Sequence, residues 1–334
     1  MRPVRVGNPP GRRKPRVARS VSSDAVSISP GRYRAITIGA LVGLMVIVVT
    51  GAAVRLTGSG LGCRDWPQCS DERLIDVSSG HAAIEQINRL FTGLVAVAVI
   101  AAVLGSLWRQ PRRRDLTILS LGLVAGVVGQ IVLGGVTVLV DLHPLAVQAH
   151  FLLSMILVAD AVVLVHRAGE PDKGNRTRAV TTVTARLTWL VALATGVALV
   201  TGTVVTGAGP HAGDEEARRF DVAISEAARV HGISVTIALL LAVGLAFRLS
   251  RHDEDRPQLQ APLSTWIFVG LLQAAVGYTQ YFNDVPPLLV GIHVAGATLL
   301  WAMTVRLVLA IHVVAIEPRT VERPAPGLVA SGGR

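Results

Sequence analysis

Charged residues are scarce in this sequence. Asp, Glu, Lys and Arg make up 16% of its 334 residues, whereas hydrophobic residues make up 51% and the mean hydropathy is +0.53. Such a composition excludes an ordinary water-soluble domain. The long apolar runs also lack the alternation of polar and apolar residues, over about ten positions, that marks the strands of a membrane barrel. The composition therefore predicts an all-α protein embedded in a membrane.

Cysteine is almost absent. The only two, Cys63 and Cys69, lie in the segment RLTGSGLGCRDWPQC, directly after the first apolar run. A zinc site would need more ligands than this segment offers, because only His81 lies near. We expect instead a small disulfide ring on the oxidising side of the membrane. A redox-active role stays open, because exposed bridges that close short loops are often labile.

Eight apolar runs are each long enough to cross a bilayer. They lie near residues 36–54, 88–108, 116–140, 145–166, 187–207, 230–249, 264–282 and 288–314, and each is bounded by polar or charged residues. We therefore predict eight transmembrane helices. Arg and Lys collect in the N-terminal tail and in the loops after the second, fourth and sixth of these helices.

The positive-inside rule makes the side with these cations cytoplasmic, so both termini are expected in the cytoplasm. The loops left outside are residues 55–84, 141–144, 208–225 and 283–287. The net charge of +10 is then a signal of topology and not of nucleic-acid binding. His211, in the third outer loop, is expected to be solvated. The glycine-rich loop at 55–84 is expected to act as a lid, because glycine permits sharp turns and close approach to a planar ligand.

The sequence repeats at an offset of 143 residues, which aligns 130–150 with 273–293 without a gap. This alignment pairs Gln130 with Gln273, Gly134 with Gly277, Pro144 with Pro287 and His150 with His293. The same offset lays Asn88 over His231. At a slightly larger offset, VVTGAAVRLTGSG resembles LVTGTVVTGAGP. The repeat predicts two pseudo-symmetric four-helix bundles related by an axis along the membrane normal.

The repeat also divides the chain into segments. We expect a disordered basic tail (1–34), an N-terminal bundle (35–166), a cytoplasmic linker (167–186), a C-terminal bundle (187–314) and a disordered tail (315–334). The first tail is poor in acidic residues, a composition that an organellar transit peptide would share. A cleaved secretory signal fits less well, because the first apolar run is too long.

Two histidines, His231 and His293, lie a turn or two inside the expected outer surface, near the starts of the sixth and eighth helices. Inward-pointing imidazoles on facing helices of a bundle are the usual axial ligands of a haem. An isolated histidine would more simply form a hydrogen bond with a carbonyl or a neighbouring helix. Two at matching depth, in a repeat whose other copy keeps one of them, favour iron ligands.

The first half differs. Its His150 corresponds to His293, but Asn88 stands where the second half has His231, and Glu85 lies about one helical turn before Asn88. Two imidazoles leave a haem iron coordinatively saturated and suit electron transfer. One imidazole beside a carboxylate and an amide leaves room for chemistry on a bound porphyrin. The alternative is that Glu85 favours the positive end of the helix dipole and pairs with Arg89. Arg89 is also suited to bind a porphyrin propionate.

At these residues the sequence resembles the haem A synthase family. The resemblance rests on the loop RLTGSGLGCRDWPQC, on EQINR at the start of the second helix, and on one histidine near the outer end of each later even-numbered helix. It covers about residues 35–314. Asn88 stands where many members have a second histidine. In this respect the motif resembles the asparagine version found in actinobacterial relatives.

The resemblance implies a membrane oxidoreductase that oxidises a ring methyl of haem O to a formyl group and so supplies haem A to terminal oxidases. It implies a haem b cofactor on His231 and His293, and a substrate pocket in the N-terminal bundle with His150 as iron ligand. Glu85 matches the family's catalytic carboxylate. The other expected substrate contacts are Asn88, Arg89 and Arg55.

The expected partners are haem O and membrane lipid. A haem O synthase and a quinone or other electron acceptor are further candidates, and a bacterial plasma membrane fits better than a mitochondrial inner membrane. The rival function is a di-haem b-type cytochrome that exchanges electrons with quinone, but it would need two complete histidine pairs. A transporter with parallel repeats would instead place its polar residues at midplane.

Overall fold

The computed structural model describes residues 27–70 and 75–315. Within these residues it contains eight long helices: α1 (Pro30–Leu56), α2 (Gly80–Trp108), α3 (Arg114–Leu139), α4 (Pro144–Ala168), α5 (Thr182–Ala208), α6 (Ile224–Arg251), α7 (Arg256–Phe282) and α8 (Pro287–Leu309). Each is long and apolar enough to cross a membrane. The prediction of an all-α protein with eight spans is therefore confirmed.

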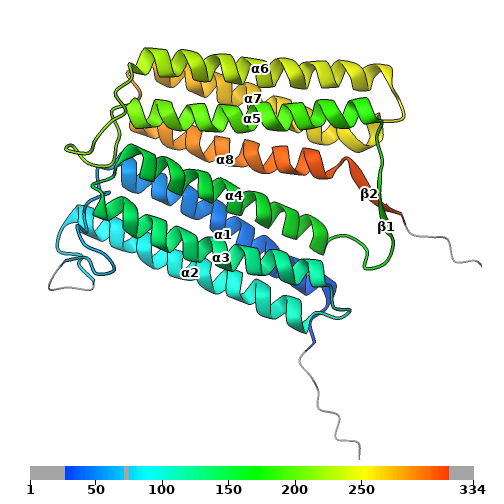
Figure 1. Ribbon diagram of the computed structural model, residues 1–334, viewed down its shortest axis with the longest axis horizontal. Helices are drawn as coiled ribbons and strands as arrows, with labels where there is room; N and C mark the ends of the chain where they lie inside the picture. Colours follow the sequence, from blue (N-terminus) through cyan, green and yellow to red (C-terminus); the bar gives the residue numbers. More distant parts are fainter. Residues whose placement is uncertain (1–26, 71–74, 316–334) are drawn as a thin grey trace, which may run out of the picture.

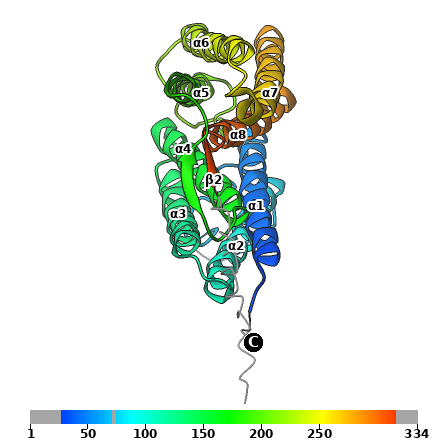
Figure 2. The ribbon, with the colours of Figure 1, turned by 90° about the vertical axis from the view of Figure 1, so that its right-hand side faces the viewer.

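The helices form two bundles, α1–α4 and α5–α8, which lie side by side (Figures 1 and 2). Each has its own apolar core, centred on residues such as Leu123 and Val158 in the first and Leu245 and Trp266 in the second. Helix α8 packs against α1 and α4, and α5 packs against α4. The two helices that carry His150 and His293, α4 and α8, therefore meet at the seam between the bundles.

Local signals explain where several helices begin. The Ser29 hydroxyl accepts a hydrogen bond from the amide of Arg32, and the Ser79 hydroxyl accepts one from Ala82, so both serines cap orphan amides of a first turn. Proline stands in the first turn of α1, α4, α7 and α8, where its missing amide costs nothing.

The turns before α4 and α8 have the same unusual backbone. Non-glycine residues with positive φ occur there in consecutive pairs, namely Asp141 and Leu142 (52° and 55°) and Asp284 and Val285 (58° and 57°). The amide of Leu142 donates to the carbonyl of Thr137 at 2.9 Å. The amide of Val285 donates to the carbonyl of Gln280 at 2.8 Å. Because left-handed non-glycine residues are uncommon, this match shows that the 143-residue repeat extends to the backbone.

Two ends of the molecule can be distinguished. The disulfide end contains residues 57–70, 75–79, 140–143, 209–223 and 283–286, and the arginine-rich end contains residues 109–113, 169–181 and 310–315. The start of α1 and the end of α8 both lie at the arginine-rich end (Figure 1). The prediction that this end faces the cytoplasm stays a prediction.

The structure departs from the expected boundaries at both ends of the chain. Helix α1 begins at Pro30, inside the expected tail, while residues 1–26 of that tail lie outside the described residues. Helix α8 ends at Leu309, and strand β2 (His312–Ala315) pairs antiparallel with β1 (Asn175–Arg178) in the linker. The expected eighth helix extends to residue 314 because the apolar run continues to that point, although the adjacent valines in the run favour a strand. Residues 316–334 are likewise not described.

Candidate functional site

The structure brings the two predicted histidines of the second bundle together. His231 on α6 and His293 on α8 face each other with ring centroids 6.3 Å apart and ring planes at 86°. Each ring lies against a glycine of a neighbouring helix. A Cβ on Gly202 would lie 3.1 Å from Cε1 of His231, and one on Gly277 would lie 3.3 Å from Cε1 of His293. Glycine therefore makes room for both rings.

The two imidazoles differ in how Nδ1 is held. The Thr201 hydroxyl lies 3.3 Å from Nδ1 of His231 and within 3.1 Å of the backbone carbonyls of Val197 and Ala198. The hydroxyl has one hydrogen, which these carbonyls accept, so both its oxygen and the carbonyl of Ala198 offer acceptors to Nδ1–H. Nε2 of His231 is then the unprotonated nitrogen, the form that binds a metal. Nδ1 of His293 is buried and has no partner among the described residues.

This pair fits a haem iron. An imidazole nitrogen binds a transition metal at about 2 Å, so two axial imidazoles place their centroids roughly 6 Å apart, close to the observed 6.3 Å. Among the described residues no group of three or more His, Cys, Asp or Glu side chains could hold a metal. Two imidazoles alone therefore suit a metal that brings its own equatorial ligands, as a haem does.

The first bundle repeats half of this arrangement. A Cβ on Gly134 would lie 3.3 Å from Cε1 and 3.9 Å from Nδ1 of His150, the same two distances that relate Gly277 to His293. Nδ1 of His150 is also buried without a partner among the described residues. His150 on α4 and His293 on α8 therefore occupy equivalent places.

Asn88 interrupts the equivalence. The Thr50 hydroxyl lies 2.9 Å from Oδ1 of Asn88, just as Thr201 lies beside His231. The amide therefore occupies the place of the second imidazole, and His150 faces no partner ring. Sequence reasoning overlooked the two threonines, although each is the middle residue of a repeated Val-Thr-Gly, at 49–51 and 200–202.

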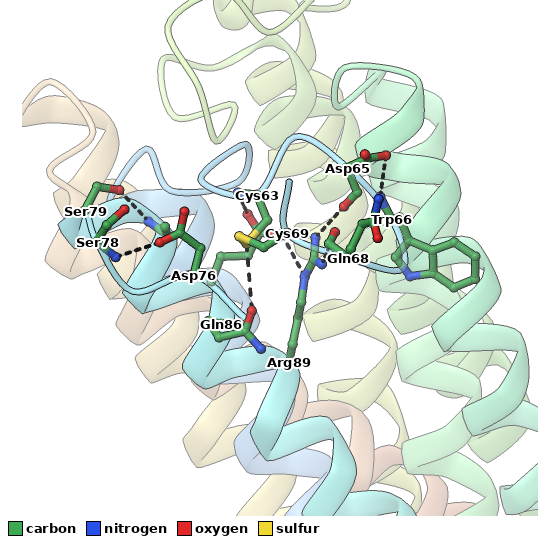
Figure 3. Close-up of a disulfide and its surroundings, with 12 residues drawn as sticks. Cys63, Asp65, Trp66, Gln68, Cys69, Asp76, Ser78, Ser79, Gln86 and Arg89 are labelled. Atoms are coloured by element: carbon green, nitrogen blue, oxygen red, sulfur yellow. Dashed lines mark hydrogen bonds and ion pairs between the residues drawn. A yellow bond between two sulfur atoms is a disulfide. The ribbon is translucent and has the colours of Figure 1, made fainter. Parts of the chain in front are cut away.

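Glu85 lies beneath the loop at the disulfide end and is 5% exposed. Its carboxylate accepts from the backbone amide of Cys63 at 2.8 Å and from Arg89 at 3.0 Å and 2.6 Å. Arg89 also donates to the carbonyls of Asp65 and Gln68, both at 3.3 Å (Figure 3). The pairing of Glu85 with Arg89 is therefore present. No hydrogen bond joins Glu85 to His150 within the described part of the chain.

The predicted disulfide joins Cys63 to Cys69. The expectation of an exposed bridge is wrong, because the two cysteines are 0% and 3% exposed and pack against Ala82 of α2. The loop presses closely on α2 there, since a Cβ on Gly62 would lie 2.5 Å from the backbone of His81. Residues 71–74 of the loop lie outside the described residues.

Arg55 and His211 tie the two bundles together at the disulfide end. The Arg55 guanidinium donates to the carbonyls of His211 and Thr206 at 2.6 Å and 2.7 Å. Nε2 of His211 lies 2.8 Å from the carbonyl of Val285. The expectation of a solvated His211 is therefore wrong, because its loop folds back over the seam between the bundles. Of the Arg55 nitrogens, Nη1 forms no hydrogen bond among the described residues.

These features define a membrane protein built from a duplicated four-helix bundle, with two facing histidines in its second copy and one histidine at the equivalent place in its first. The chain belongs to the COX15-CtaA family, described as cytochrome oxidase assembly protein, whose family model matches residues 34–305.

Individual relatives are similar over a shorter part. A heme A synthase of Lysinibacillus sphaericus is 28% identical over 137 residues, which are 41% of this chain and 45% of that protein. Heme A synthases of Exiguobacterium sibiricum and Bacillus pumilus are 30% and 32% identical, each over 36% of this chain and over 41% and 40% of their own lengths. The chain thus spans less than half the length of these curated relatives.

Proposed function

We propose that this protein is a haem A synthase, which oxidises a ring methyl of haem O to a formyl group and supplies haem A to terminal oxidases. The asymmetry between two otherwise equivalent pockets carries this proposal. The later copy pairs His231 with His293 at the spacing of two axial ligands. The earlier copy pairs His150 with Asn88, which suits a porphyrin that is a substrate and not a permanent electron carrier. The family and the names of the relatives support the same activity.

His231 and His293 would hold haem b, which when bound supplies one-electron transfer. The Thr201 hydroxyl would accept from Nδ1–H of His231 and so leave Nε2 unprotonated, the form that would bind an iron. Gln148 on α4 donates a 2.7 Å hydrogen bond to the Thr203 hydroxyl on α5. This bond links the helix of His150 with the helix of Thr201. The electron acceptor beyond this bundle is proposed to be a quinone or another membrane carrier.

In the first bundle, His150 would bind the iron of haem O, and Asn88 stands where the second bundle has His231. Two successive hydroxylations of the methyl, each with an oxygen from water, would each release two electrons and two protons, and loss of one water from the diol would give the aldehyde, so that four electrons in total pass to the acceptor named above. Glu85 is proposed to take the methyl proton or to stabilise the developing positive charge. The Cys63 amide and Arg89 fix its orientation. Arg89, and Nη1 of Arg55, are the proposed donors to the propionates.

The remaining parts of the proposal concern location. The arginine-rich end is proposed to face the cytoplasm of a bacterium, with the protein in the plasma membrane. Haem O would come from a haem O synthase in the same membrane. The loop that contains the disulfide would cover the substrate site and exclude water.

Expression in a strain that makes haem O tests this function. We expect the purified protein to show a b-type spectrum, and chromatography of extracted haems to reveal haem A that a vector control lacks. His231→Ala or His293→Ala should abolish the b-type spectrum, whereas His150→Ala should keep it and stop haem A formation. Protein without porphyrin and without turnover would refute the proposal. Two quinol-reducible b haems and no haem A would favour the di-haem cytochrome.

A further inference from the structure

A polar cavity lies at the arginine-rich end, remote from both histidine sites. It has a volume of about 380 Å³ and is formed where α3 begins, where α4 ends and where β1 passes. Its lining residues are mainly charged: Arg113, Arg114, Asp115, Arg167, Glu170 and Asp172. None of the roles assigned above uses this cavity.

The carboxylates of the cavity are already neutralised. Asp115 accepts two hydrogen bonds from Arg113, at 3.1 Å and 2.7 Å. Glu170 is paired with Arg176, and Asp172 is paired with Arg109. Each acidic group therefore has an arginine partner, and the charge of Arg167 acts in addition on Glu170 and Asp115.

Two arginines are in surplus. Within the described residues, neither Arg114 nor Arg167 forms an ion pair or a side-chain hydrogen bond. Nε of Arg167 is buried without a partner, a state that costs free energy unless a ligand supplies an acceptor. Arg34 approaches the same corner, since its Nε lies 3.0 Å from the position of a Cβ on Gly169. The cavity thus carries net positive charge, and the side chain of Arg167, one of its lining residues, has a donor without a partner.

The paired arginines keep their charge. Burial works against the charged form of Arg113, but the hydrogen bonds and charge of Asp115, with the charges of Glu170 and Asp172, raise its pKa above the ordinary value. Arg113 also donates to the carbonyl of Arg167 at 2.9 Å, which holds the end of α4 against the start of α3.

Next to the cavity, the exposed face of α3 is apolar. Arg114 stands at the start of α3, and Ile118, Leu121 and Val128 continue the same face of the helix. These three side chains are 58%, 51% and 55% exposed. A ligand whose anionic group reaches Arg114 can therefore lay hydrocarbon along α3, whereas a soluble anion would leave this face unused.

We propose that this cavity binds the phosphate of an anionic phospholipid, with Arg114 and Arg167 as its ligands and an acyl chain along the exposed face of α3. Basic pockets between transmembrane helices near the membrane surface are known to suit such headgroups. The bound lipid would join α3, α4 and the linker strand β1. Because β1 pairs with β2 beyond α8, the lipid would also strengthen the connection between the two bundles.

Native mass spectrometry and thermal unfolding of the purified full-length protein test this proposal. We expect phosphatidylglycerol to remain bound and to raise the unfolding temperature, and phosphatidylcholine with the same chains to do neither. The double variant Arg114→Gln, Arg167→Gln should weaken phosphatidylglycerol binding about tenfold or more. Arg186→Gln is the matched control, because Arg186 is exposed on α5 at the same end but lies outside the cavity.

A single variant and a competition with inorganic phosphate distinguish the remaining explanations. If the double variant does not fold, the single variant Arg114→Gln on the exposed face should still reduce binding. Inorganic phosphate at millimolar concentration should not displace the lipid, and displacement would assign the site to a soluble anion instead. Equal binding by the variants and the parent protein, or equal loss in Arg186→Gln, would overturn the proposal. None of these readouts depends on haem, so they stand apart from the proposed synthase activity.

Discussion

The hydroxyl oxygen of Thr201 lies 3.3 Å from Nδ1 of His231. Its hydrogen is directed to a backbone carbonyl of the preceding turn, so the oxygen acts as an acceptor for the ring. Thr50 occupies the same place beside Asn88 in the first bundle. One polar position has thus been kept in both copies of the repeat, while its neighbour is an imidazole in one and an amide in the other.

Thr201→Val tests whether this hydroxyl tunes the proposed haem b. Valine keeps the shape but offers no acceptor, so His231 becomes a less basic ligand and the reduced iron is relatively favoured. A hydrogen bond worth about 1 kcal/mol corresponds to roughly 40 mV for one electron. We therefore expect the midpoint potential to rise by about that amount in a redox titration. Thr50→Val is the control and should leave this potential unchanged, and an unshifted potential in Thr201→Val would exclude the tuning role.

Glu85→Gln separates charge from shape at the proposed catalytic site. Glutamine retains an oxygen for the Cys63 amide but loses the negative charge that pairs with Arg89. We expect the b-type spectrum to persist and haem A to disappear from the extracted haems, because the proton acceptor is gone. Normal haem A formation by this variant would remove the carboxylate from the mechanism and leave it as a structural partner of Arg89.

The parts of the fold and the site that the sequence predicted are each indicated by a local sequence pattern or by the internal repeat. The eight spans follow from apolar runs, and the facing histidines follow from equal spacing in two copies of one repeat. The pairing of Cys63 with Cys69 follows from short separation and from the absence of other cysteines. In each case, neighbouring residues or internal symmetry limit the possible arrangements.

The contacts that the sequence did not predict join positions that neither a local pattern nor the repeat relates to each other. The bond from Arg55 to the carbonyl of His211 links positions 156 residues apart, and no pattern at either position indicates it. The burial of the disulfide depends on how closely the loop packs against α2 at Gly62. The short strand at His312–Ala315 forms only because β1 lies beside it, whereas its apolar composition alone resembles the end of a helix.

The buried disulfide should resist reductant in the folded protein. Both sulfur atoms lie in a core cluster with Ala82, so attack by an external thiol requires the loop to open first. We expect a thiol-reactive probe to label the cysteines in denaturant plus reductant but not under native conditions with mild reductant. Cys63→Ser should lower the free energy of unfolding by roughly 2 kcal/mol, the value for a short closed loop. Rapid native labelling would contradict the burial.

Arg55→Lys tests the tie between the bundles. Lysine keeps the charge but cannot reproduce the fork that reaches the carbonyls of Thr206 and His211. The loss of two charge-assisted hydrogen bonds should destabilise the loop 209–223 by about 2 kcal/mol or more. Faster proteolysis within this loop is the expected result. If Nη1 also binds a propionate, the variant should show a raised KM for haem O, and an unchanged KM would restrict Arg55 to the structural role.

Gly277→Ala and Gly134→Ala form a matched pair, because each added Cβ would meet Cε1 of a histidine at 3.3 Å. This distance is shorter than an ordinary contact, so His293 or His150 must shift by a few tenths of an ångström while the surrounding helices keep their packing. We expect Gly277→Ala to alter the b-type spectrum or lower haem b occupancy. We expect Gly134→Ala to leave haem b intact and to reduce haem A formation.

The opposite pattern, or identical effects of the two alanines, would contradict the assignment of one pocket to the cofactor and the other to the substrate. The two substitutions are the same in size and have the same distance to the ring. A difference between them must therefore come from what each pocket binds. Because both glycines lie near the disulfide ends of α3 and α7, a general loss of stability would affect both variants and is measured separately by thermal unfolding.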